Sequence, residues 1–426
     1  MGTIPVFNIV TDYGAVGSGS TADAATNTNA FLSAISAAAG GGIIFVPPSA
    51  GGFVVNNGVI VITSPNITIA GAGSMGSAGN LSTPQGIGGS TIIGFGPGTI
   101  TNRDTITINQ VGCTIENLAF LPIGTQSGSY LSITGTDCWV KNVHMQSPNI
   151  GISLTTPVTA LGQFWIEDLQ IAGSPIIGGI HAEIGECTLY LSHVIMGIDL
   201  SLVPLPTQPA YGVAVTCAGE VLICNGTDIA FMGTCLELVP NNTQSVVATF
   251  ISDSFFDSGN GPACLYIAPS GTGYVSTVHL SSVWTSTGHN AGLPTSGFKF
   301  LGSGGTGVMP GTIENVTMVN CLAKGFNNGQ SGLYAAGVNG LSVTSSTFGA
   351  NGNGIVIAPG MNNFILNGNK CGKYVPNNSG GNDFFGIVVG SGCDKFIVAN
   401  NLCYGNVFGG RTIAPGITYI DINNIP

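Results

Sequence analysis

Charged side chains are scarce in this chain of 426 residues. It has 8 Lys plus Arg and 19 Asp plus Glu, which is 6% of all residues, whereas about a quarter is usual. Eight basic residues and a net charge of −11 argue against a nucleic-acid partner, because phosphate binding depends on clustered Lys and Arg. Intrinsic disorder is also excluded, since it requires high charge and low hydrophobicity, and 44% of the residues are hydrophobic.

Long apolar runs and targeting segments are absent as well. No stretch approaches about 18 uninterrupted apolar residues, so we expect no transmembrane helix and no membrane insertion. The segment Met1–Pro5 has neither the basic nor the apolar region of a signal peptide. Two routes out of a cell remain open: release without the secretory pathway, as in cell lysis, or secretion with a leader that has been removed.

Glycine, by contrast, is abundant. The 67 Gly residues follow no strict third-residue period, so collagen is excluded. From about residue 100 onward one unit recurs: a Gly with an apolar-x-apolar triplet, a turn, a second strand and a small polar residue. Its period-2 alternation is typical of strands. These units open at Gly151, Gly179, Gly212, Gly297, Gly332, Gly354 and Gly386.

A polar residue ends the second strand of each unit. These positions recur about 23 to 38 residues apart, as in a coil repeat with loops of variable length. A sandwich gives no reason for such a position, whereas side-chain amides can stack along coils that lie on one another. The pattern therefore predicts an all-β fold, a parallel β-helix, with a ladder at Asn117, Asn142, Asp168, His193, Asn225, Asp253, Ser282, Asn320, Ser346, Asn369 and Asn401.

The N-terminal segment has a different pattern. Residues 26–39 are expected to form a helix, with Phe31 and Ile35 on its apolar face and glycines after its end. A stack of coils exposes an open end, which such a helix can cover. We therefore expect a single elongated domain, in which a cap segment at 1–55 continues into β-helix coils at 56–426.

Three motifs of this segment resemble the N-terminal signature of the pectate-lyase-like superfamily. They are Asp12-Tyr13-Gly14-Ala15-Val16-Gly17-Ser18-Gly19, Ala30-Phe31-Leu32-Ser33-Ala34-Ile35 and Gly40-Gly41-Gly42-Ile43-Ile44-Phe45-Val46-Pro47. Ser18 and the lone Asp23 depart from that signature in the capping turn. The resemblance implies a right-handed parallel β-helix with an N-terminal capping helix. The superfamily includes pectin-degrading lyases, polygalacturonase-type hydrolases and phage tailspikes, so the fold does not choose a function.

Outward side chains next to the Gly openings are expected to stack from coil to coil, about 4.8 Å apart. The resemblance implies a saccharide groove on such a face. The predicted outward row is Ser132, Ser153, His181, Ala214, Glu237, Tyr266, Lys299, Tyr334, Val356 and Val388, with Glu183 two residues beyond His181. The candidate catalytic residues are Glu183, Glu237, His181 and Lys299, and the candidate carbohydrate-binding residues are Tyr266 and Tyr334.

Two catalytic schemes fit this row. Glu183 and Glu237 would form a carboxylate pair about 10 Å apart at the backbone, near the separation of inverting glycosidases. A lyase would instead use Lys299 as the proton-abstracting base, with Tyr266 nearby. The tyrosines also offer apolar faces to sugars. The alternative is that all of these are ordinary polar residues on a solvated sheet.

The known catalytic motifs of the superfamily are missing. The polygalacturonase-type set N-T-D, D-D, H-G and R-I-K is absent, and the only arginines are Arg103 and Arg411, outside the central coils. These absences count against a plain pectinase. His181, Glu183 and Glu186 have a spacing that suggests a metal site. However, Glu186 falls in a turn, and His193 of the polar ladder lies on another side of the coil. No metal and no cofactor is therefore predicted.

Several stacked pairs are interpreted as packing. The eleven cysteines form no C-x-x-C motif, so zinc-ribbon and thioredoxin-type sites are excluded, and buried thiol ladders are slightly favoured over disulfides. The relevant pairs are Cys113 with Cys138 and Cys371 with Cys403. Trp139 and Trp165 are expected to pack on each other, and Glu116, Lys141 and Glu167 to form a surface ion-pair row.

Two functions fit these observations. The first is a virion protein of tailspike or fibre type, a homotrimer that binds cell-surface polysaccharide and contacts other virion proteins. The missing signal peptide and a surface of Gly, Ser, Thr and Asn, suited to packing against copies, favour it. The alternative is a secreted, extracellular polysaccharide lyase or glycoside hydrolase. A surface adhesin is a weaker third option, because it would need a translocation segment.

Overall fold

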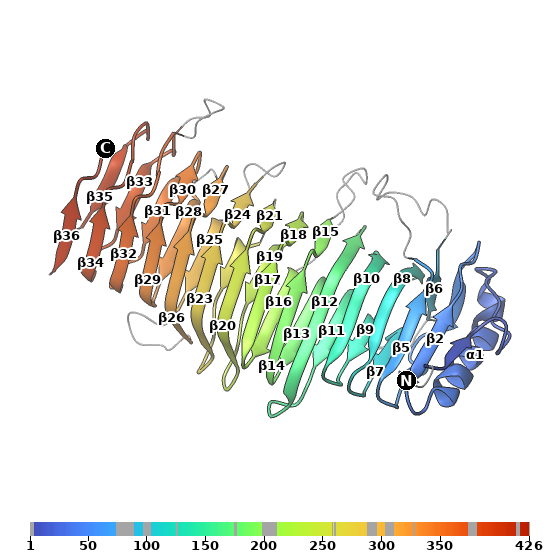
Figure 1. Ribbon diagram of the computed structural model, residues 1–426. Coiled ribbons are helices and arrows are strands. Elements are labelled where there is room, and N and C mark those ends of the chain that lie inside the picture. Colours follow the sequence, from blue (N-terminus) through green and yellow to red (C-terminus); the bar gives the residue numbers. More distant parts are fainter. Residues whose placement is uncertain are drawn as a thin grey trace. The chain divides into compact units, whose positions relative to one another are not determined.

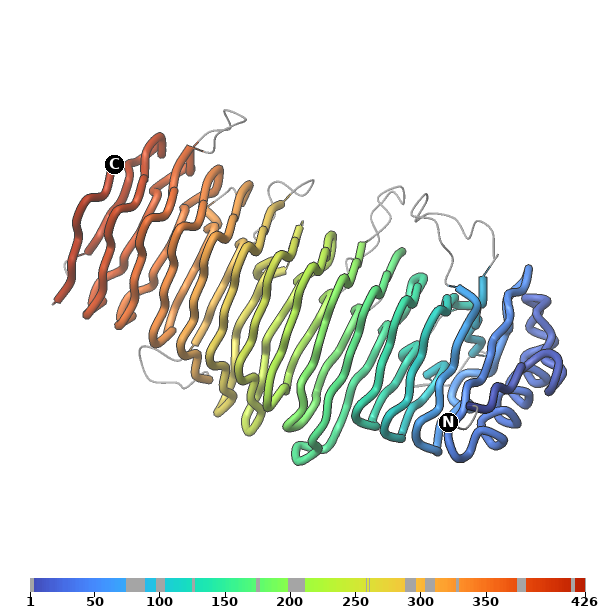
Figure 2. The backbone as a smooth tube through the Cα atoms, in the orientation of Figure 1, coloured from blue at the N-terminus to red at the C-terminus, as the bar shows by residue number. Residues whose placement is uncertain are grey.

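A computed structural model describes residues 4–73, 89–96, 104–124, 127–173, 177–197, 211–257, 259, 261–287, 296–302, 311–326, 329–373, 381–414 and 418–425. The chain divides into two compact units, unit 1 at residues 1–209 and unit 2 at residues 210–426. Each unit is described by itself (Figures 1 and 2). The predicted division into a cap at 1–55 and one continuous domain stays a prediction.

Unit 1 holds the α-helix and fifteen of the strands. In chain order its elements are β1 (Val6–Asn8), the short 3-10 helix η1 (Thr21–Asp23), α1 (Ala24–Ala37), β2 (Gly42–Val46), β3 (Phe53–Asn56), β4 (Ile60–Ile62), β5 (Ile67–Gly71), β6 (Thr91–Phe95), β7 (Ile106–Ile108), β8 (Thr114–Ile123), β9 (Ser129–Ile133), β10 (Cys138–Gln146), β11 (Ile150–Thr155), β12 (Leu161–Ala172), β13 (Gly178–Ile184), β14 (Glu186–Ser192) and β15 (Ile195–Gly197).

Unit 2 consists of strands and their connections. They are β16 (Tyr211–Ala218), β17 (Val221–Asn225), β18 (Asp228–Ala230), β19 (Thr234–Leu238), β20 (Ser245–Ser252), β21 (Phe255–Asp257), β22 (Ala263–Ile267), β23 (Tyr274–Ser281), β24 (Trp284–Ser286), β25 (Ser296–Leu301), β26 (Thr312–Val319), β27 (Leu322–Lys324), β28 (Ser331–Ala336), β29 (Val338–Thr344), β30 (Thr347–Gly349), β31 (Asn353–Ile357), β32 (Asn362–Asn367), β33 (Phe385–Val389), β34 (Asp394–Ala399), β35 (Gly409–Ile413) and β36 (Tyr419–Ile422).

Each coil contributes to three parallel sheets, which we call A, B and C within a unit. In unit 1, sheet A is β4–β7–β9–β11–β13, sheet B is β1–β2–β5–β8–β10–β12–β14, and sheet C is β3–β6–β8–β10–β12–β15. Strands β8, β10 and β12 bend and so belong to both B and C. The winding of successive coils can be followed in Figure 2.

Unit 2 repeats the same three-sheet arrangement. Its sheet A is β16–β19–β22–β25–β28–β31–β33–β35, and its sheet B is β17–β20–β23–β26–β29–β32–β34–β36. Sheet C is β18–β21–β24–β27–β30. All of these pairings are parallel, so the predicted parallel β-helix is confirmed.

The core of each unit is filled by the inward-facing half of every strand, because successive side chains point to opposite faces. In sheet A of unit 2, for example, the inward column runs through Val213, Leu236, Leu265 and Phe298, which are fully buried and in register. Ladders of stacked apolar side chains of this kind stabilise each coil through its neighbours.

The recurring glycines are required by the close approach of neighbouring coils. A Cβ atom on Gly354 would lie 2.4 Å from the carbonyl oxygen of Gly386, and one on Gly297 would lie 2.6 Å from that of Gly332. No side chain fits at such distances, so the glycine that opens each unit lets the backbone of the next coil pass.

Helix α1 covers the first coils of unit 1. It spans Ala24–Ala37, where the sequence predicts residues 26–39, because η1 already starts the turn that leads into it. Phe31 and Ile35 are buried on its inner face. Asn27, also buried, accepts from Val16 N and donates to Val54 O, which fastens the helix to β3. The expected N-terminal cap is therefore present.

The predicted polar ladder combines two different columns. The bend between sheets B and C is made by residues with positive φ, among them Asn117, Asn142, Asp168, His193, Asp253, Ser282 and Asn320. In register with them stand Gly226, Ser345, Gly368 and Asn400, so placing Asn225, Ser346, Asn369 and Asn401 in that column was wrong by one residue. Asn, Asp and Gly suit the bend because they tolerate the left-handed conformation.

The residue after the bend points into the core, and in the last coils it forms a second, buried ladder. Ser346 N donates to Asn369 Oδ1, and Asn369 Nδ2 donates to Asn401 Oδ1, both at 3.0 Å. Asn401 continues the series to Asn424. The prediction that side-chain amides bond from coil to coil is confirmed for this column, where burial makes each bond obligatory.

All eleven cysteines are free and buried. Cys113 lies one coil before Cys138, because the next residues Thr114 and Trp139 are paired. The favoured buried thiol ladder is thus confirmed for this pair. Among the residues that the structure describes, no helix is long and apolar enough to cross a membrane.

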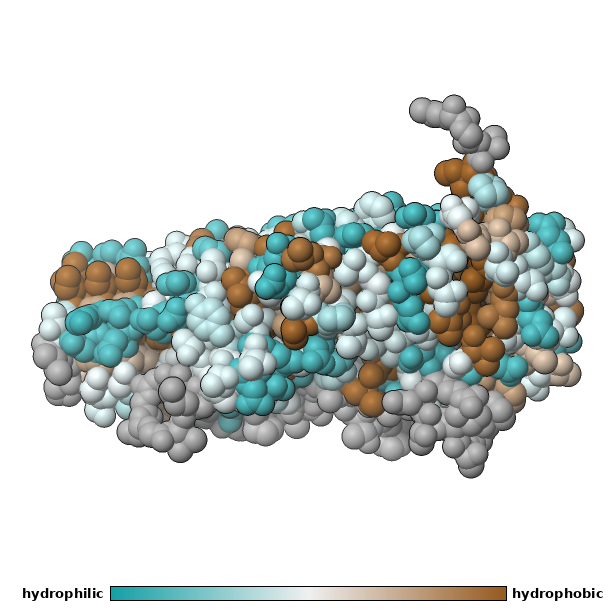
Figure 3. All heavy atoms as spheres, turned by 90° about the horizontal axis from the view of Figure 1, so that it is seen from below, coloured by the Kyte–Doolittle hydropathy of each residue, from teal (hydrophilic) through white to brown (hydrophobic). Residues whose placement is uncertain are grey.

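The exposed surface mixes polar and apolar side chains. On the face drawn in Figure 3, the largest hydrophobic area of unit 1 lies toward the end that carries α1. Within unit 1, Phe95, Leu121 and Ile123 pack, partly buried, on a small core cluster of Ala24, Val54 and Ile93, so helix α1 shares this cluster with β3 and β6.

Candidate functional site

The outward face of sheet A in unit 2 carries a row of candidate site residues. Ala214, Glu237, Tyr266, Lys299 and Tyr334 are in register on β16, β19, β22, β25 and β28. Neighbouring coils lie about 4.8 Å apart, so the four larger side chains span three coil spacings. We call Glu237, Tyr266, Lys299 and Tyr334 the sheet A stripe. The predicted outward row is confirmed within this unit.

Glu237 is the chemically distinctive member of the stripe. Burial raises its pKa from 4.5 to about 7, because removal of water disfavours the carboxylate more than the neutral acid. The coil before it presents only the methyl group of Ala214 at the same position. Near neutral pH, Glu237 can therefore either donate or accept a proton.

Two tyrosines lie within electrostatic reach of Glu237. Burial raises the pKa of Tyr211 to about 12, and the charge of Glu237 adds to the effect. Burial also raises the pKa of Tyr266, again with a contribution from Glu237. Both phenols therefore stay neutral and can donate hydrogen bonds. Tyr211 was missed by sequence reasoning, although its place directly before the Gly212 opening marks it as the first residue of β16.

Lys299 provides the positive charge of the stripe. Its Nζ lies 5.9 Å from the centroid of the Tyr334 ring, a distance at which the cation and the ring attract each other. Tyr266 and Tyr334 flank Lys299 on the coils before and after it. The arrangement offers apolar ring surfaces and one ammonium donor two coils from the acid.

His181 and Glu183 lie in unit 1, on sheet A strand β13. They are half-buried and in register with Ser153 and Thr155 of the preceding strand. Burial lowers the pKa of His181, and the charge of Glu183 partly opposes this shift. The other four candidates lie in unit 2, so the pairing of Glu183 with Glu237 stays a prediction.

The metal-like motif around His181 does not assemble. Within the described parts of the chain no group of three or more His, Cys, Asp or Glu side chains is placed to hold a metal ion. Glu186 begins β14, on the far side of a turn from β13. The Nδ1 atom of His193 lies 3.5 Å from Asp168 Oδ1 on the exposed bend column, the ladder role expected for it.

The other stacked pairs are found as predicted. The rings of Trp139 and Trp165 lie 4.5 Å apart, and Lys141 Nζ lies 3.9 Å from Glu167 Oε2. Cys371 and Cys403 are close enough for a thiol hydrogen bond. Of the two arginines, Arg411 lies on β35, and Arg103 lies outside the described residues.

A second polar cluster on sheet C of unit 2 was not foreseen. Ser286 Oγ donates to Asp257 Oδ1 at 2.5 Å, and Lys324 Nζ lies 5.1 Å from the ring of Trp284. Burial, followed by the charge of Asp257, raises the pKa of Asp228. These positions follow no Gly opening, which is why repeat reasoning passed over them.

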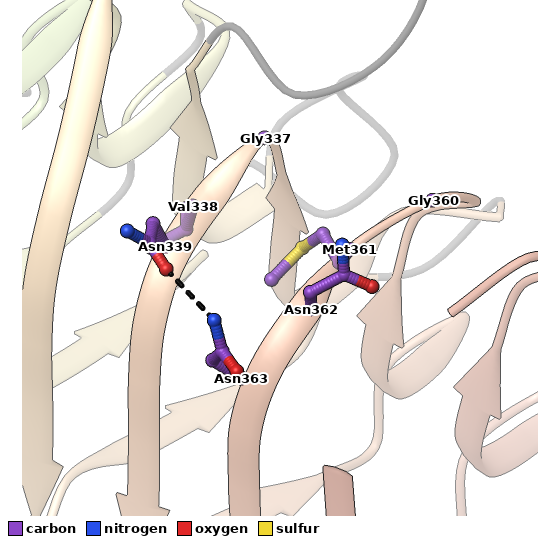
Figure 4. Close-up of a pocket in the computed structure, with 7 residues that line it drawn as sticks. All are labelled: Gly337, Val338, Asn339, Gly360, Met361, Asn362 and Asn363. Atoms are coloured by element: carbon purple, nitrogen blue, oxygen red, sulfur yellow. Dashed lines mark hydrogen bonds between the residues drawn. The ribbon is translucent and has the colours of Figure 1, made fainter. Parts of the chain in front are cut away.

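A shallow hollow of about 170 Å³ lies between two coils of unit 2 (Figure 4). Asn363 Nδ2 donates to Asn339 Oδ1 at 3.1 Å across its mouth. Asn362 Oδ1 is already occupied by Asp394 N. The side-chain amides of the hollow mainly form hydrogen bonds with each other and with the backbone. We therefore interpret the hollow as a surface depression at the turns and not as a binding site.

Comparison with solved structures supports the fold. The chain is similar to the Dettilon tailspike protein (TM-score 0.54, 11% identity, 97% of this chain and 68% of that one). It is similar to an exopolygalacturonase from Thermotoga maritima (TM-score 0.50, 13% identity, 86% and 88%). It also resembles a DFA-IIIase from Arthrobacter chlorophenolicus A6 (TM-score 0.53, 10% identity, 97% and 99%).

No protein-family profile matches the sequence, and no curated protein matches it. The structural likenesses, all at low identity, concern the fold. The chain has a right-handed parallel β-helix with an N-terminal capping helix, as the sequence predicts. These solved structures include a tailspike protein and an exopolygalacturonase.

Proposed function

We propose that this chain is a polysaccharide-binding β-helix of the phage tailspike type, which engages a cell-surface polysaccharide along the sheet A stripe of unit 2. The stripe carries the proposal. Glu237, Tyr266, Lys299 and Tyr334 stand in one straight column on consecutive coils, so their spacing suits a chain-like ligand laid across the strands.

Each stripe residue has a role that its chemistry allows. The rings of Tyr266 and Tyr334 offer faces to the C–H surfaces of sugars, and their hydroxyls offer hydrogen bonds. Lys299 donates to hydroxyl or carboxylate oxygens. Its position beside Tyr334 limits the rotamer freedom that binding would otherwise remove.

A second candidate function, glycan cleavage, is favoured by one observation. A carboxyl group with a pKa of about 7 is suited to protonate a glycosidic oxygen at neutral pH. In this scheme Glu237 is the general acid, and Lys299 of the same unit is the candidate base. The chain would then be a secreted, extracellular hydrolase or lyase, or a tailspike that also depolymerises its receptor.

The tailspike proposal includes an assembly and a location. We propose a homotrimer in the virion, in contact with other virion proteins. Only 6% of the residues are charged. This supports close packing of copies, because few charged side chains would lose their water at the contact. Light scattering on the full chain tests the trimer directly.

The function is tested by binding and product assays on the full chain. A panel of bacterial capsular and O-antigen polysaccharides is offered to the native protein and to Tyr266→Ala, Tyr334→Ala and Glu237→Gln. Val356→Ala, at a later position of the same outward column, is the matched control. Retained binding in both tyrosine variants would contradict the stripe as the binding surface.

Product formation separates the two candidates. If the native protein releases reducing ends or unsaturated sugars and Glu237→Gln abolishes this while binding remains, the cleavage function is correct. Saturable binding without products, together with a trimer, supports the adsorption function. A monomer that releases oligosaccharides contradicts the virion role and favours the secreted enzyme.

A further inference from the structure

A second surface, on sheet B of unit 1, has the features of a sugar platform. Trp139, Trp165 and Tyr190 are in register on β10, β12 and β14. The first two rings lie 4.5 Å apart with a tilt of 38°, and the second pair 5.8 Å apart and nearly parallel at 6°. Two of the three tryptophans of the chain therefore stand in one outward column.

The column ends abruptly on its N-terminal side. The residue in register with Trp139 on β8 is Thr114, and the next one on β5 is Thr68. Both side chains are short, so the two coils before Trp139 present no large side chain in register with it; the next residue of the column is Ile43 on β2. Trp139 is 43% exposed, whereas Trp165 is half-buried between its two neighbours. The surface is therefore low over Thr68 and Thr114 and rises at Trp139, whose indole ring forms an exposed apolar face. We call this change in height the step.

Polar groups flank this step. Glu116, two residues beyond Thr114 on β8, is half-buried and outward-facing. Lys141 occupies the equivalent place beside Trp139 and is in register with both Glu116 and Glu167. The threonine hydroxyls, the carboxylates and the ammonium group together supply donors and acceptors around an apolar wall, which is the combination that sugar rings require.

We propose that Trp139, Thr114, Thr68 and Glu116 form a glycan-binding ledge that is separate from the sheet A stripe. Trp165 packs against Trp139, and Tyr190 stacks on Trp165. These contacts hold the ring of Trp139 in place, so that little freedom is lost on binding. A sugar ring rests its C–H face on the indole and bonds its hydroxyls to the threonines and Glu116.

The charges select the class of glycan. Glu116 and Glu167 outnumber Lys141, and the chain as a whole has a net charge of −11. A uronate polymer would be repelled here. The ledge therefore takes uncharged hexose or N-acetylhexosamine residues. The inference shares only the saccharide class with the proposed function and does not depend on the stripe.

Tryptophan fluorescence provides a direct test. In a full-chain Trp284→Phe protein the emission comes from Trp139 and Trp165 alone, since the chain has 3 Trp. We expect cellotetraose or chitotetraose to change this emission saturably and tetragalacturonate to leave it unchanged. The added change Trp139→Ala should weaken the binding of the neutral tetrasaccharides about tenfold or more, as for a central aromatic contact, measured by calorimetry.

Two further variants keep the test decisive. Trp139→Phe preserves an aromatic face and should retain part of the affinity, and its thermal unfolding checks the fold. Phe250→Ala removes a comparably exposed aromatic (41%) from unit 2 and should change nothing. No saturable response to either neutral tetrasaccharide, unchanged affinity in Trp139→Ala, or a preference for tetragalacturonate would overturn the ledge.

The ledge and the stripe can fail independently. Tyr266→Ala and Tyr334→Ala leave unit 1 intact, so they should not change the fluorescence response. If polysaccharide binding is lost in the tyrosine variants while the tetrasaccharide response persists, both sites exist. If the response is absent and polysaccharide binding still depends on the tyrosines, only the ledge is wrong.

Discussion

Arg411 and Asp421 form an ion pair where the preceding coil has two core residues. Arg411 Nη2 lies 3.0 Å from Asp421 Oδ2, and Nε lies 3.3 Å from the same oxygen. Arg411 is in register with the buried Ile387, and Asp421 with the buried Val398. The last coil that the structure describes thus replaces two inward apolar side chains with a charged pair.

Removal of one partner should destabilise unit 2. The two side chains are only 29% and 23% exposed, so Arg411→Ala leaves a carboxylate poorly solvated and without its cation. We expect a loss of about 1–3 kcal/mol in the free energy of unfolding, measured by urea denaturation. Lys141→Ala is the control: its pair with Glu167 is more exposed and longer, so a loss below about 1 kcal/mol is expected. Equal losses would contradict the special role of Arg411.

Glu237 should make stability depend on pH. Its pKa is about 7 in the folded protein and 4.5 when the side chain is fully solvated, as in the unfolded chain. Between these pH values the folded protein therefore holds a proton that the unfolded chain has released. The stabilising contribution is therefore complete below about pH 4.5 and is lost as the pH rises through about 7.

Glu237→Gln removes this dependence. At pH 8 the variant should be more stable than the native protein by about 1–3 kcal/mol, and near pH 4 the difference should vanish. Urea unfolding at pH 4, 6 and 8 measures both values. A constant difference across this range would show that the glutamine acts through packing rather than through the charge.

The buried amide ladder should contribute strongly to unit 2. Asn369 is fully buried; its Oδ1 accepts from Ser346 N, and its Nδ2 donates to Val343 O and Asn401 Oδ1. Asn369→Ala leaves these partners unpaired in the core and should cost about 2–4 kcal/mol.

An exposed amide provides the matched control for the ladder. Asn363 bonds to Asn339 on the surface, where water can replace the lost partner. Asn363→Ala should therefore cost less than about 1 kcal/mol, measured in the same denaturation series. If the two substitutions proved equivalent, the coil-to-coil bonds of the inner ladder would not be the stabilising element.

The thiols should be protected in the native state. Burial raises the pKa of Cys138 to about 12 and that of Cys224 and Cys321 to about 11, so few thiolates form at pH 8. Cys403 differs, because the hydrogen bond from Cys371 lowers its pKa. With Ellman's reagent we expect no rapid reaction of the folded protein and eleven thiols after unfolding, with Cys403 the first to react. Rapid release of several equivalents without denaturant would contradict the buried ladders.

The repeat was predictable because its cause is local. An alternation of apolar and polar residues sets which side chains face inward, and a glycine is needed wherever the next coil passes too close for a Cβ atom. These two signals were sufficient to place Glu237, Tyr266, Lys299 and Tyr334 on one face. The helix was also predictable to within two residues, from its apolar face and the glycines after it.

The errors have an equally specific cause. Asn225, Ser346, Asn369 and Asn401 were aligned with the bend residues because every unit has a polar residue at about that point. Asn225 lies one residue before the bend and is exposed, whereas Ser346, Asn369 and Asn401 lie one residue after it and are buried. These adjacent columns accept overlapping residue types. Only the hydrogen-bond register between coils separates them, and a one-residue shift exchanges the inside and the outside.

The sequence by itself determined the β-helix, its cap and the outward column of candidate residues, because side-chain alternation and turn chemistry act over a few neighbouring residues. Tertiary structure alone decided which side chains have a shifted pKa or an exposed aromatic face. The pKa of Glu237 rises to about 7 through burial among residues from other coils. Trp139 is exposed because its neighbour on the preceding coil is the short Thr114, about 25 residues earlier in the chain. Solvation and stacking depend on what lies one coil away, and that distance is short in space but long in the chain.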